Sequence, residues 1–192
     1  MIRKTSSESI APYLRDASNY SGGKADEVLI PGNVDELVRA LKNDLRPVTI
    51  SGAGTGLTAS RISPEGIIIS LEQLNELGTV KDGEIWLGPA VSLVSLQEYL
   101  KKTNYFYPHN PTEINASIGG TLATNASGSR SYKFGVTRNF VNAVDCILAD
   151  GRRVLVKRGH KITEPLLLDD GSEIEFPEIE YISPNCKNAA GY

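Results

Sequence analysis

Three short apolar runs, separated by an amphipathic stretch, dominate the first third of the chain. The runs cover Glu27 to Ile30, Val48 to Ser51 and Ile67 to Ser70, and each is typical of a buried strand. Asn33, with Glu36 three residues later, is a capping-box arrangement that predicts the start of a helix. Apolar residues at helical spacing would form its buried face: Leu37, Val38 and Leu41. The pattern therefore indicates a βαβ-like unit with helices against a small parallel sheet.

The middle of the chain predicts a turn, a second helix and a hairpin. Asp82-Gly83 is a turn signal followed by a short strand-like run. Ser92 would cap a helix that continues to about residue 102. The inward residues of this helix would be Leu93, Leu96 and Leu100. Phe140 to Leu148 and Arg153 to Val156 are expected to pair around the turn Asp150-Gly151.

Composition narrows the classes of function. The 192 residues suit one domain or two small lobes, and a net charge of −3 gives no electrostatic basis for binding nucleic acid. No apolar run approaches transmembrane length, and Met1 leads into polar residues rather than the apolar core of a signal peptide. His109 and His160 provide no metal-ligand cluster. Cys146 and Cys186 are expected to be free thiols, which favours a cytoplasmic location for the protein. A cluster of basic residues between 152 and 161 leaves peripheral attachment to a membrane open.

The first glycine-bearing loop is Ser51-Gly52-Ala53-Gly54-Thr55-Gly56-Leu57. Glycine carries no Cβ and reaches positive φ without strain, so successive backbone N–H groups can converge on a phosphate. A Rossmann turn is excluded because Pro64 and Gly66 follow too soon for a crossover helix, and no Lys follows the glycines as in a P-loop. For this loop alone, a plain tight turn between two strands remains an equal alternative.

The second glycine-bearing loop runs from Ser117 to Gly128 and carries no charged side chain. Gly119-Gly120 could open a short helix from Thr121 to Ala126, whose N-terminal dipole would favour an anion. A small-residue helix packed in a core remains the alternative, although buried polar side chains in the loop would need partners. Two such loops indicate one long ligand, and we interpret it as a dinucleotide, flavin adenine dinucleotide (FAD) in particular.

An ordered set of motifs resembles the FAD-linked oxidases of the vanillyl-alcohol-oxidase or p-cresol-methylhydroxylase (PCMH) type. Within that family the chain is most similar to the glycolate oxidase and D-lactate dehydrogenase group. The motifs are Pro31 to Leu37, the two glycine loops, Pro108 to Thr112, Phe134-Gly135, Leu148 to Gly151 and the closing Lys187-Asn188-Ala189-Ala190-Gly191-Tyr192.

The resemblance implies an α+β fold, the PCMH-type FAD-binding fold of two α/β lobes. A small parallel sheet with helices would be followed by a mixed or antiparallel sheet, with the C-terminal part missing. Residues 1–24 would be an N-terminal segment, 25–159 the FAD-binding domain with lobes at about 25–75 and 76–159, and 160–192 an irregular tail ending at the KNxxGY-like motif.

The resemblance also implies the cofactor and its contacts. Family members with flavin attached through the first loop have a histidine there; Thr55 takes that place here and no cysteine precedes Gly119, so non-covalent FAD is expected. His109 is expected to be a structural, hydrogen-bonding histidine, with an approach to the flavin as the alternative. The assigned cofactor-binding residues are Ser51, Gly52, Ala53, Gly54, Thr55, Gly56, Leu57, Pro111, Thr112, Gly119, Gly120, Thr121, Thr124, Asn125, Ser127 and Gly128.

The complete enzyme would oxidise a small-molecule 2-hydroxy acid and pass electrons to oxygen, a quinone or a partner. A cap domain or an iron–sulfur or electron-transfer partner would complete it, so this chain alone is expected to be inactive and its catalytic residues stay unknown. Three alternatives remain: a module like that of UDP-N-acetylenolpyruvylglucosamine reductase, an electron-transfer subunit, and an inactive fragment.

Overall fold

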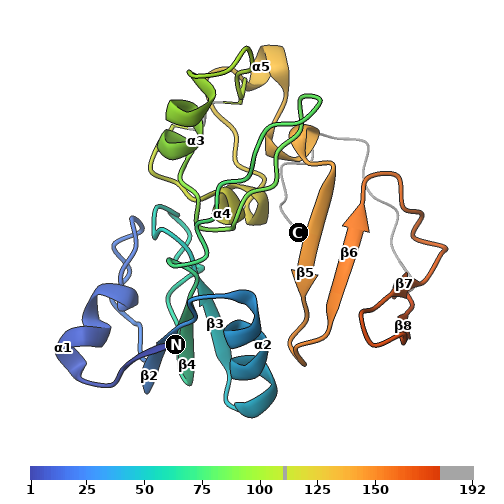
Figure 1. Cartoon of the computed structure of the whole chain (residues 1–192). Coiled ribbons are helices and arrows are strands. Elements are labelled where there is room, and N and C mark those ends of the chain that lie inside the picture. Colours follow the sequence, from blue (N-terminus) through green and yellow to red (C-terminus); the bar gives the residue numbers. More distant parts are fainter. Residues whose placement is uncertain (110–111, 178–192) are drawn as a thin grey trace.

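A four-stranded mixed sheet forms one end of the molecule (Figure 1). In this computed structural model, which describes residues 1–109 and 112–177, the strand order is β1-β2-β4-β3. The strands are β1 (Ile2–Lys4), β2 (Glu27–Ile30), β3 (Val48–Ser51) and β4 (Ile67–Ser70). The last three are parallel, as the apolar runs predicted, and every residue of β2 and β4 is buried. The antiparallel edge strand β1 was not predicted.

Helices cover both faces of this sheet. Helix α2 (Val34–Asn43) packs Leu37 and Ala40 against one face, whereas α1 (Ser7–Ile10) and the 3₁₀ helix η1 (Ala11–Leu14) cover the other. Helix α2 begins where the sequence predicted, because the Asn33 side chain accepts a hydrogen bond from the Glu36 amide at 2.9 Å. The Glu36 carboxylate accepts from the Gly32 amide, one residue earlier than in a standard capping box.

A second apolar cluster surrounds α3 (Leu93–Leu100), which is capped by Ser92 as predicted. The turn at Asp82-Gly83 is present, but the residues beside it form isolated bridges rather than a regular strand. Three short helices follow: α4 (Ile118–Ala123), α5 (Ser131–Phe134) and the 3₁₀ helix η2 (Thr137–Phe140). Helix α4 therefore includes the two glycines that were expected to precede it.

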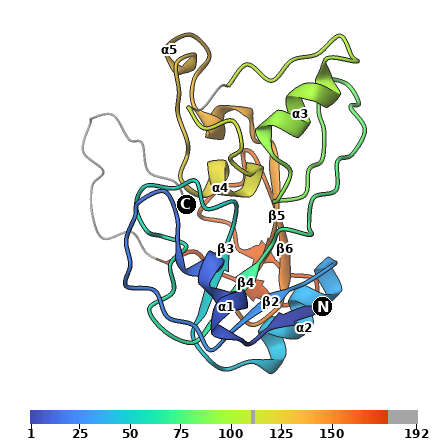
Figure 2. The ribbon, with the colours of Figure 1, turned by 90° about the vertical axis from the view of Figure 1, so that its left-hand side faces the viewer.

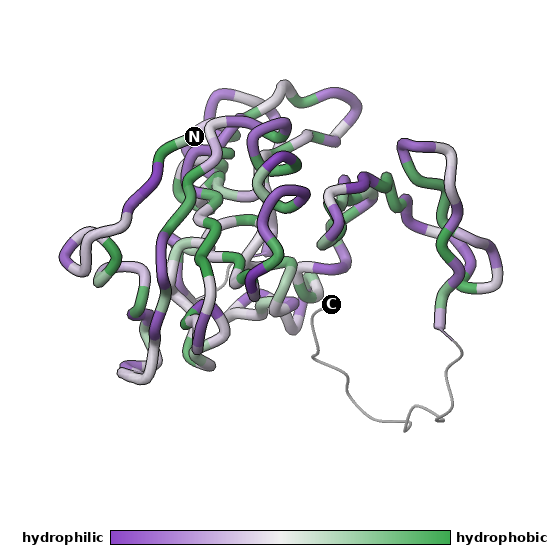
Figure 3. The backbone as a smooth tube through the Cα atoms, turned by 90° about the horizontal axis from the view of Figure 1, so that it is seen from below, coloured by the Kyte–Doolittle hydropathy of each residue, from purple (hydrophilic) through white to green (hydrophobic). Residues whose placement is uncertain are grey.

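The chain then forms two small antiparallel pairs. Strands β5 (Ala143–Ile147) and β6 (Arg153–Lys157) make the hairpin predicted around Asp150-Gly151. Strands β7 (Leu166–Leu167) and β8 (Glu173–Ile174) lie beyond it, and the segment from β6 to β8 extends to one side of the main body (Figures 1 and 3). The α+β prediction is confirmed. No helix in the described ranges is long and apolar enough to cross a membrane.

Candidate functional site

The first glycine loop follows β3 directly, and two of its carbonyl oxygens, those of Gly52 and Gly54, accept hydrogen bonds within the protein. The Gly52 carbonyl accepts a hydrogen bond from Arg61 Nη1 at 3.1 Å, and the Gly54 carbonyl accepts from the Ala17 amide, also at 3.1 Å. Gly54 has φ +75°, a conformation that glycine reaches without strain. Ser51, at the end of the strand, is fully buried and its carbonyl accepts from the Leu71 amide.

The backbone N–H groups of the same loop are in the opposite situation. Between residues 52 and 57, no backbone N–H donates a hydrogen bond to another group in the described parts of the chain. A segment in which acceptors are hydrogen-bonded at two positions while the donors are unused can receive an anion. This asymmetry favours an anion-binding nest over the plain tight turn.

The two glycine loops meet. A Cβ added to Gly52 would lie 3.0 Å from Ser117 Oγ, and one added to Gly120 would lie at the same distance from that oxygen. Figures 1 and 2 show α4 beside the end of β3 in two perpendicular views. Gly52 and Ser117, more than 60 residues apart in the sequence, therefore lie side by side, and we call the place where the two loops meet the cradle; a Cβ at Gly52 would crowd the Ser117 hydroxyl.

Helix α4 offers fewer donors to a ligand than the sequence suggested. Its first amides, Ile118 and Gly119, already donate to the carbonyls of Val91 and Pro89 at 2.9 and 2.8 Å. The Gly119 α-carbon packs so closely on Pro89 that a Cβ would lie 2.9 Å from the proline ring. Close packing explains these small residues at least as well as a helix dipole does.

Hydroxyl and amide groups of the second loop are held mainly by backbone. The hydroxyls of Thr121 and Thr124 donate to the carbonyls of Ile118 and Gly120 at 2.8 and 3.0 Å. Asn125 is buried with φ +45°, and its side-chain oxygen accepts from the Arg138 amide at 3.1 Å. Its Nδ2 is also buried but has no hydrogen-bond partner among the described residues. An unused buried donor costs free energy, which an acceptor on a ligand would offset.

A buried aromatic cluster lies behind the second loop. His109 is 0% exposed and contacts the rings of Tyr107 and Phe140, with centroids 5.9 and 6.4 Å away. Burial lowers the pKa of His109, and the backbone groups of Gly135 and Ala126 partly oppose that effect. Burial also raises the pKa of Tyr107 to about 12. Neither ring nitrogen of His109 has a hydrogen-bond partner among the described residues, so the histidine is packed among rings but the hydrogen bonds expected for it are missing.

The structure accounts unevenly for the assigned cofactor-binding residues. It brings Gly52 of the first loop next to Ser117 at the start of the second, as described above. Thr112 is exposed, and so are Thr124 and Ser127, which leaves their side chains accessible. Pro111 and the closing KNxxGY-like motif lie outside the described residues. Arg61 was missed, because nothing in its local sequence indicates that it contacts the glycine loop.

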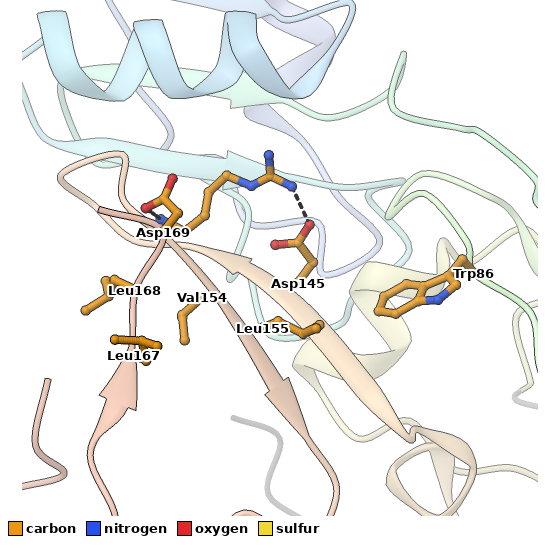
Figure 4. A pocket seen from close by; sticks show the side chains of 8 residues that line it. Trp86, Asp145, Val154, Leu155, Leu167, Leu168 and Asp169 are labelled. Carbon is orange, nitrogen blue, oxygen red and sulfur yellow. Dashed lines mark hydrogen bonds and ion pairs between the residues drawn. The ribbon is translucent and has the colours of Figure 1, made fainter. Parts of the chain in front are cut away.

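A separate hollow of about 490 Å³ lies on the β5–β6 hairpin and holds none of the assigned residues (Figure 4). The Arg153 and Asp145 side chains form an ion pair there at 2.6 Å. The remaining lining consists of Trp86, Val154, Leu155, Leu167, Leu168 and Asp169. Its charged pair is already satisfied, so the hollow is a weaker candidate than the cradle. Within the described ranges, no group of three His, Cys, Asp or Glu side chains could hold a metal ion.

Comparison with known proteins identifies the family. A family model described as "FAD binding domain" matches residues 25–157. The chain is 36% identical over 134 residues to a D-lactate dehydrogenase of Archaeoglobus fulgidus, covering 67% of this chain and 30% of that protein. It is 38% identical over 159 residues to a D-lactate dehydrogenase of Anaerostipes hadrus, covering 79% of this chain and 33% of that protein. For the glycolate oxidase subunit GlcD of Bacillus subtilis, identity is 27% over 159 residues, with the same two coverages.

A solved structure supports the fold. The chain superposes on chitooligosaccharide oxidase with a TM-score of 0.69 at 16% sequence identity, covering 81% of this chain and 34% of that one. The chain thus spans about a third of the length of these three relatives. The resemblance inferred from the ordered motifs is confirmed: this chain belongs to the FAD-binding domain family of FAD-linked oxidoreductases, and FAD is its cofactor.

Proposed function

We propose that the cradle formed by the two glycine loops holds the diphosphate of non-covalently bound FAD. The observation that carries this proposal is the set of unused N–H groups between residues 52 and 57, next to Ser117 and Gly120. A diphosphate presents several acceptor oxygens, which suits a row of backbone donors. The unpartnered Nδ2 of Asn125 adds a further donor in the second loop.

Non-covalent attachment is supported by the side chains of the cradle. Thr55 stands in the first loop where covalently linked members have histidine, and Cys146, which has a free thiol, lies on β5 rather than in either loop. We also propose that the protein is cytoplasmic, and the free thiol of Cys146 supports this location.

We further propose the two-lobe division at about 25–75 and 76–159. It is supported by separate apolar clusters, one built on the sheet around Leu29 and Ile69, and one around Leu96 of α3. Ile10 and Tyr13 pack on the sheet as well, so the segment before residue 25 covers one face of the first lobe.

In the complete protein, we propose oxidation of a 2-hydroxy acid, because two of the relatives are named D-lactate dehydrogenase and one is a glycolate oxidase subunit. Bound FAD supplies the electron acceptor, while this chain's residues bind and orient it. A cap domain or an electron-transfer partner would provide the substrate site, since the chain spans about a third of these relatives.

Titration of the 192-residue chain with FAD tests the binding proposal. We expect saturable quenching of flavin fluorescence and retention of a yellow cofactor through gel filtration. Absence of both would refute it. A screen of 2-hydroxy acids with an artificial electron acceptor, using the full-length gene product, tests the substrate class. Reduction of a UDP-linked enolpyruvyl sugar instead would assign the domain to the alternative reductase.

A further inference from the structure

Arg61 lies against the first glycine loop from its carbonyl side. Its Nη1 donates to the Gly52 carbonyl at 3.1 Å, and its Nη2 donates to the Pro12 carbonyl at 2.9 Å. A Cβ added to Gly54 would overlap the Arg61 guanidinium, so the loop and the side chain are in direct contact. The guanidinium therefore links the N-terminal segment to the loop whose amides are unused.

The positive charge of Arg61 lacks a close counter-charge. The side chain is half-buried, and no carboxylate in the described parts of the chain lies within ion-pair distance of it. Its Nε is buried and has no hydrogen-bond partner among the described residues. Burial lowers the pKa of Arg61, and the more distant Asp16 and Glu72 carboxylates only partly oppose this. A cation in such surroundings is stabilised when an anion binds nearby.

Other arginines of this chain show the usual arrangement. Arg152 pairs with Asp150 at 2.7 Å, and Arg153 pairs with Asp145 at 2.6 Å. Arg46 contacts three carboxylates, those of Asp26, Glu27 and Asp44. Arg61 differs from these three because its charge is directed at backbone carbonyls instead of a carboxylate. Arg158 also donates to backbone carbonyls, those of Val141 and Arg138, but its side chain is exposed whereas that of Arg61 is half-buried.

We propose that Arg61 is a positioning residue that recognises the diphosphate of FAD. Its two hydrogen bonds fix the loop so that the amides of residues 52–57 are available, and its charge attracts the two negative charges of the diphosphate. This inference rests on the proposed function, since it assigns a role to Arg61 in that same site. The contact also makes residues around Pro12 part of the cofactor-binding unit, although they precede the segment matched by the family model.

Substitution of Arg61 tests the proposal through FAD affinity and its salt dependence. Arg61→Met removes the charge at similar length, and Arg61→Lys keeps the charge but loses the two-pronged geometry. The matched control is Arg152→Met, because Arg152 lies at the β5–β6 turn, outside both glycine loops, and pairs there with Asp150. The neighbouring Gly151 packs on Lys42 of α2. The dissociation constant is measured by flavin fluorescence quenching at about 0.05 M and about 0.5 M NaCl, with circular dichroism to verify folding.

For the unsubstituted chain and for Arg152→Met, we expect FAD binding that weakens with salt. For Arg61→Met, we expect binding about tenfold weaker at low salt and a smaller salt dependence, as for a lost charge-assisted contact. Arg61→Lys should bind between the two and keep the salt dependence. If Arg61→Met does not fold, the proposal is tested with Arg61→Lys instead. FAD binding by Arg61→Lys that does not weaken with salt would contradict the proposal.

Two results would overturn the role of Arg61: an unchanged affinity in Arg61→Met, or an affinity lowered equally at both salt concentrations. The second would mean that the residue acts only on loop structure. Failure of the unsubstituted chain to bind FAD would be a different result, since it would refute the proposed function itself.

Discussion

Replacing Gly54 by alanine should destabilise the folded chain far more than an ordinary glycine substitution. Gly54 has φ +75°, and a residue with a Cβ pays about 1–2 kcal/mol to adopt such a left-handed conformation. In addition, the new methyl group would overlap the Arg61 guanidinium, which must then leave its place. The displacement breaks the hydrogen bonds from Arg61 to the carbonyls of Gly52 and Pro12.

The magnitude follows from these two contributions. Hydrogen bonds that involve a charged group are worth about 1.5–3 kcal/mol each, and partial exposure of Arg61 reduces the loss to about 2 kcal/mol for the pair. Together with the backbone strain, Gly54→Ala should lose about 3–4 kcal/mol of unfolding free energy. For a chain of this size, that loss lowers the melting temperature by about 6–16 °C.

Gly171→Ala provides the matched control. Gly171 has φ +81°, but no atom lies within 4 Å of a Cβ added there. This variant should therefore lose only the strain contribution, about 1–2 kcal/mol. Both variants are compared with the parent by urea denaturation followed by circular dichroism. Equal losses in the two variants would refute the inference that Arg61 is tightly packed on the loop.

Three further outcomes are expected. Gly52→Ala should change the unfolding free energy by less than about 1 kcal/mol but weaken FAD binding, because its Cβ would crowd Ser117 in the cradle. Gly171→Ala, in the turn between β7 and β8, should leave FAD affinity unchanged, and an unchanged FAD affinity in Gly52→Ala as well would contradict the cradle. Lowering the pH from 7.5 should reduce the free energy of unfolding once the pH passes below 6.5. Burial lowers the pKa of His109 in the folded chain, so only the unfolded chain takes up the proton there. His109→Phe should remove this pH dependence from a plot of urea midpoint against pH, and a plot identical to that of the parent chain would exclude the histidine as its source. Ile68→Ala should cost about 2–5 kcal/mol in denaturant titrations, because Ile68 is fully buried in β4, and a loss below about 1 kcal/mol would place it outside the core.

The parts of the fold that were predictable have strong local signals. Strands β2 and β4 are buried on both faces, so their apolar runs are unbroken, and α2 carries its own cap at Asn33. Strand β1 has no such signal: Arg3 and Lys4 are polar, and the strand exists because it pairs with β2 at the edge of the sheet. The sheet therefore provides a constraint that no window of sequence around β1 contains.

The candidate site divides in the same way. The glycine pattern identified both loops, and the positive φ of Gly54 favours glycine through local backbone geometry alone. The close approach of Gly52 to Ser117, in contrast, depends on the fold. The start of α4 was predicted too late, since tight packing of Gly119 on Pro89 overrides the poor helix propensity of glycine. Arg61 could not be identified from sequence, because its role depends on a contact with Pro12, 49 residues away.

Amide hydrogen exchange with and without FAD tests the central claim most directly. If the unused N–H groups of residues 52–57 bind the diphosphate, FAD should slow exchange there, and to a lesser extent across 117–128, while the amides of the β5–β6 hairpin are unaffected. Unchanged exchange in residues 52–57 at saturating FAD would contradict the claim that these backbone donors hold the cofactor.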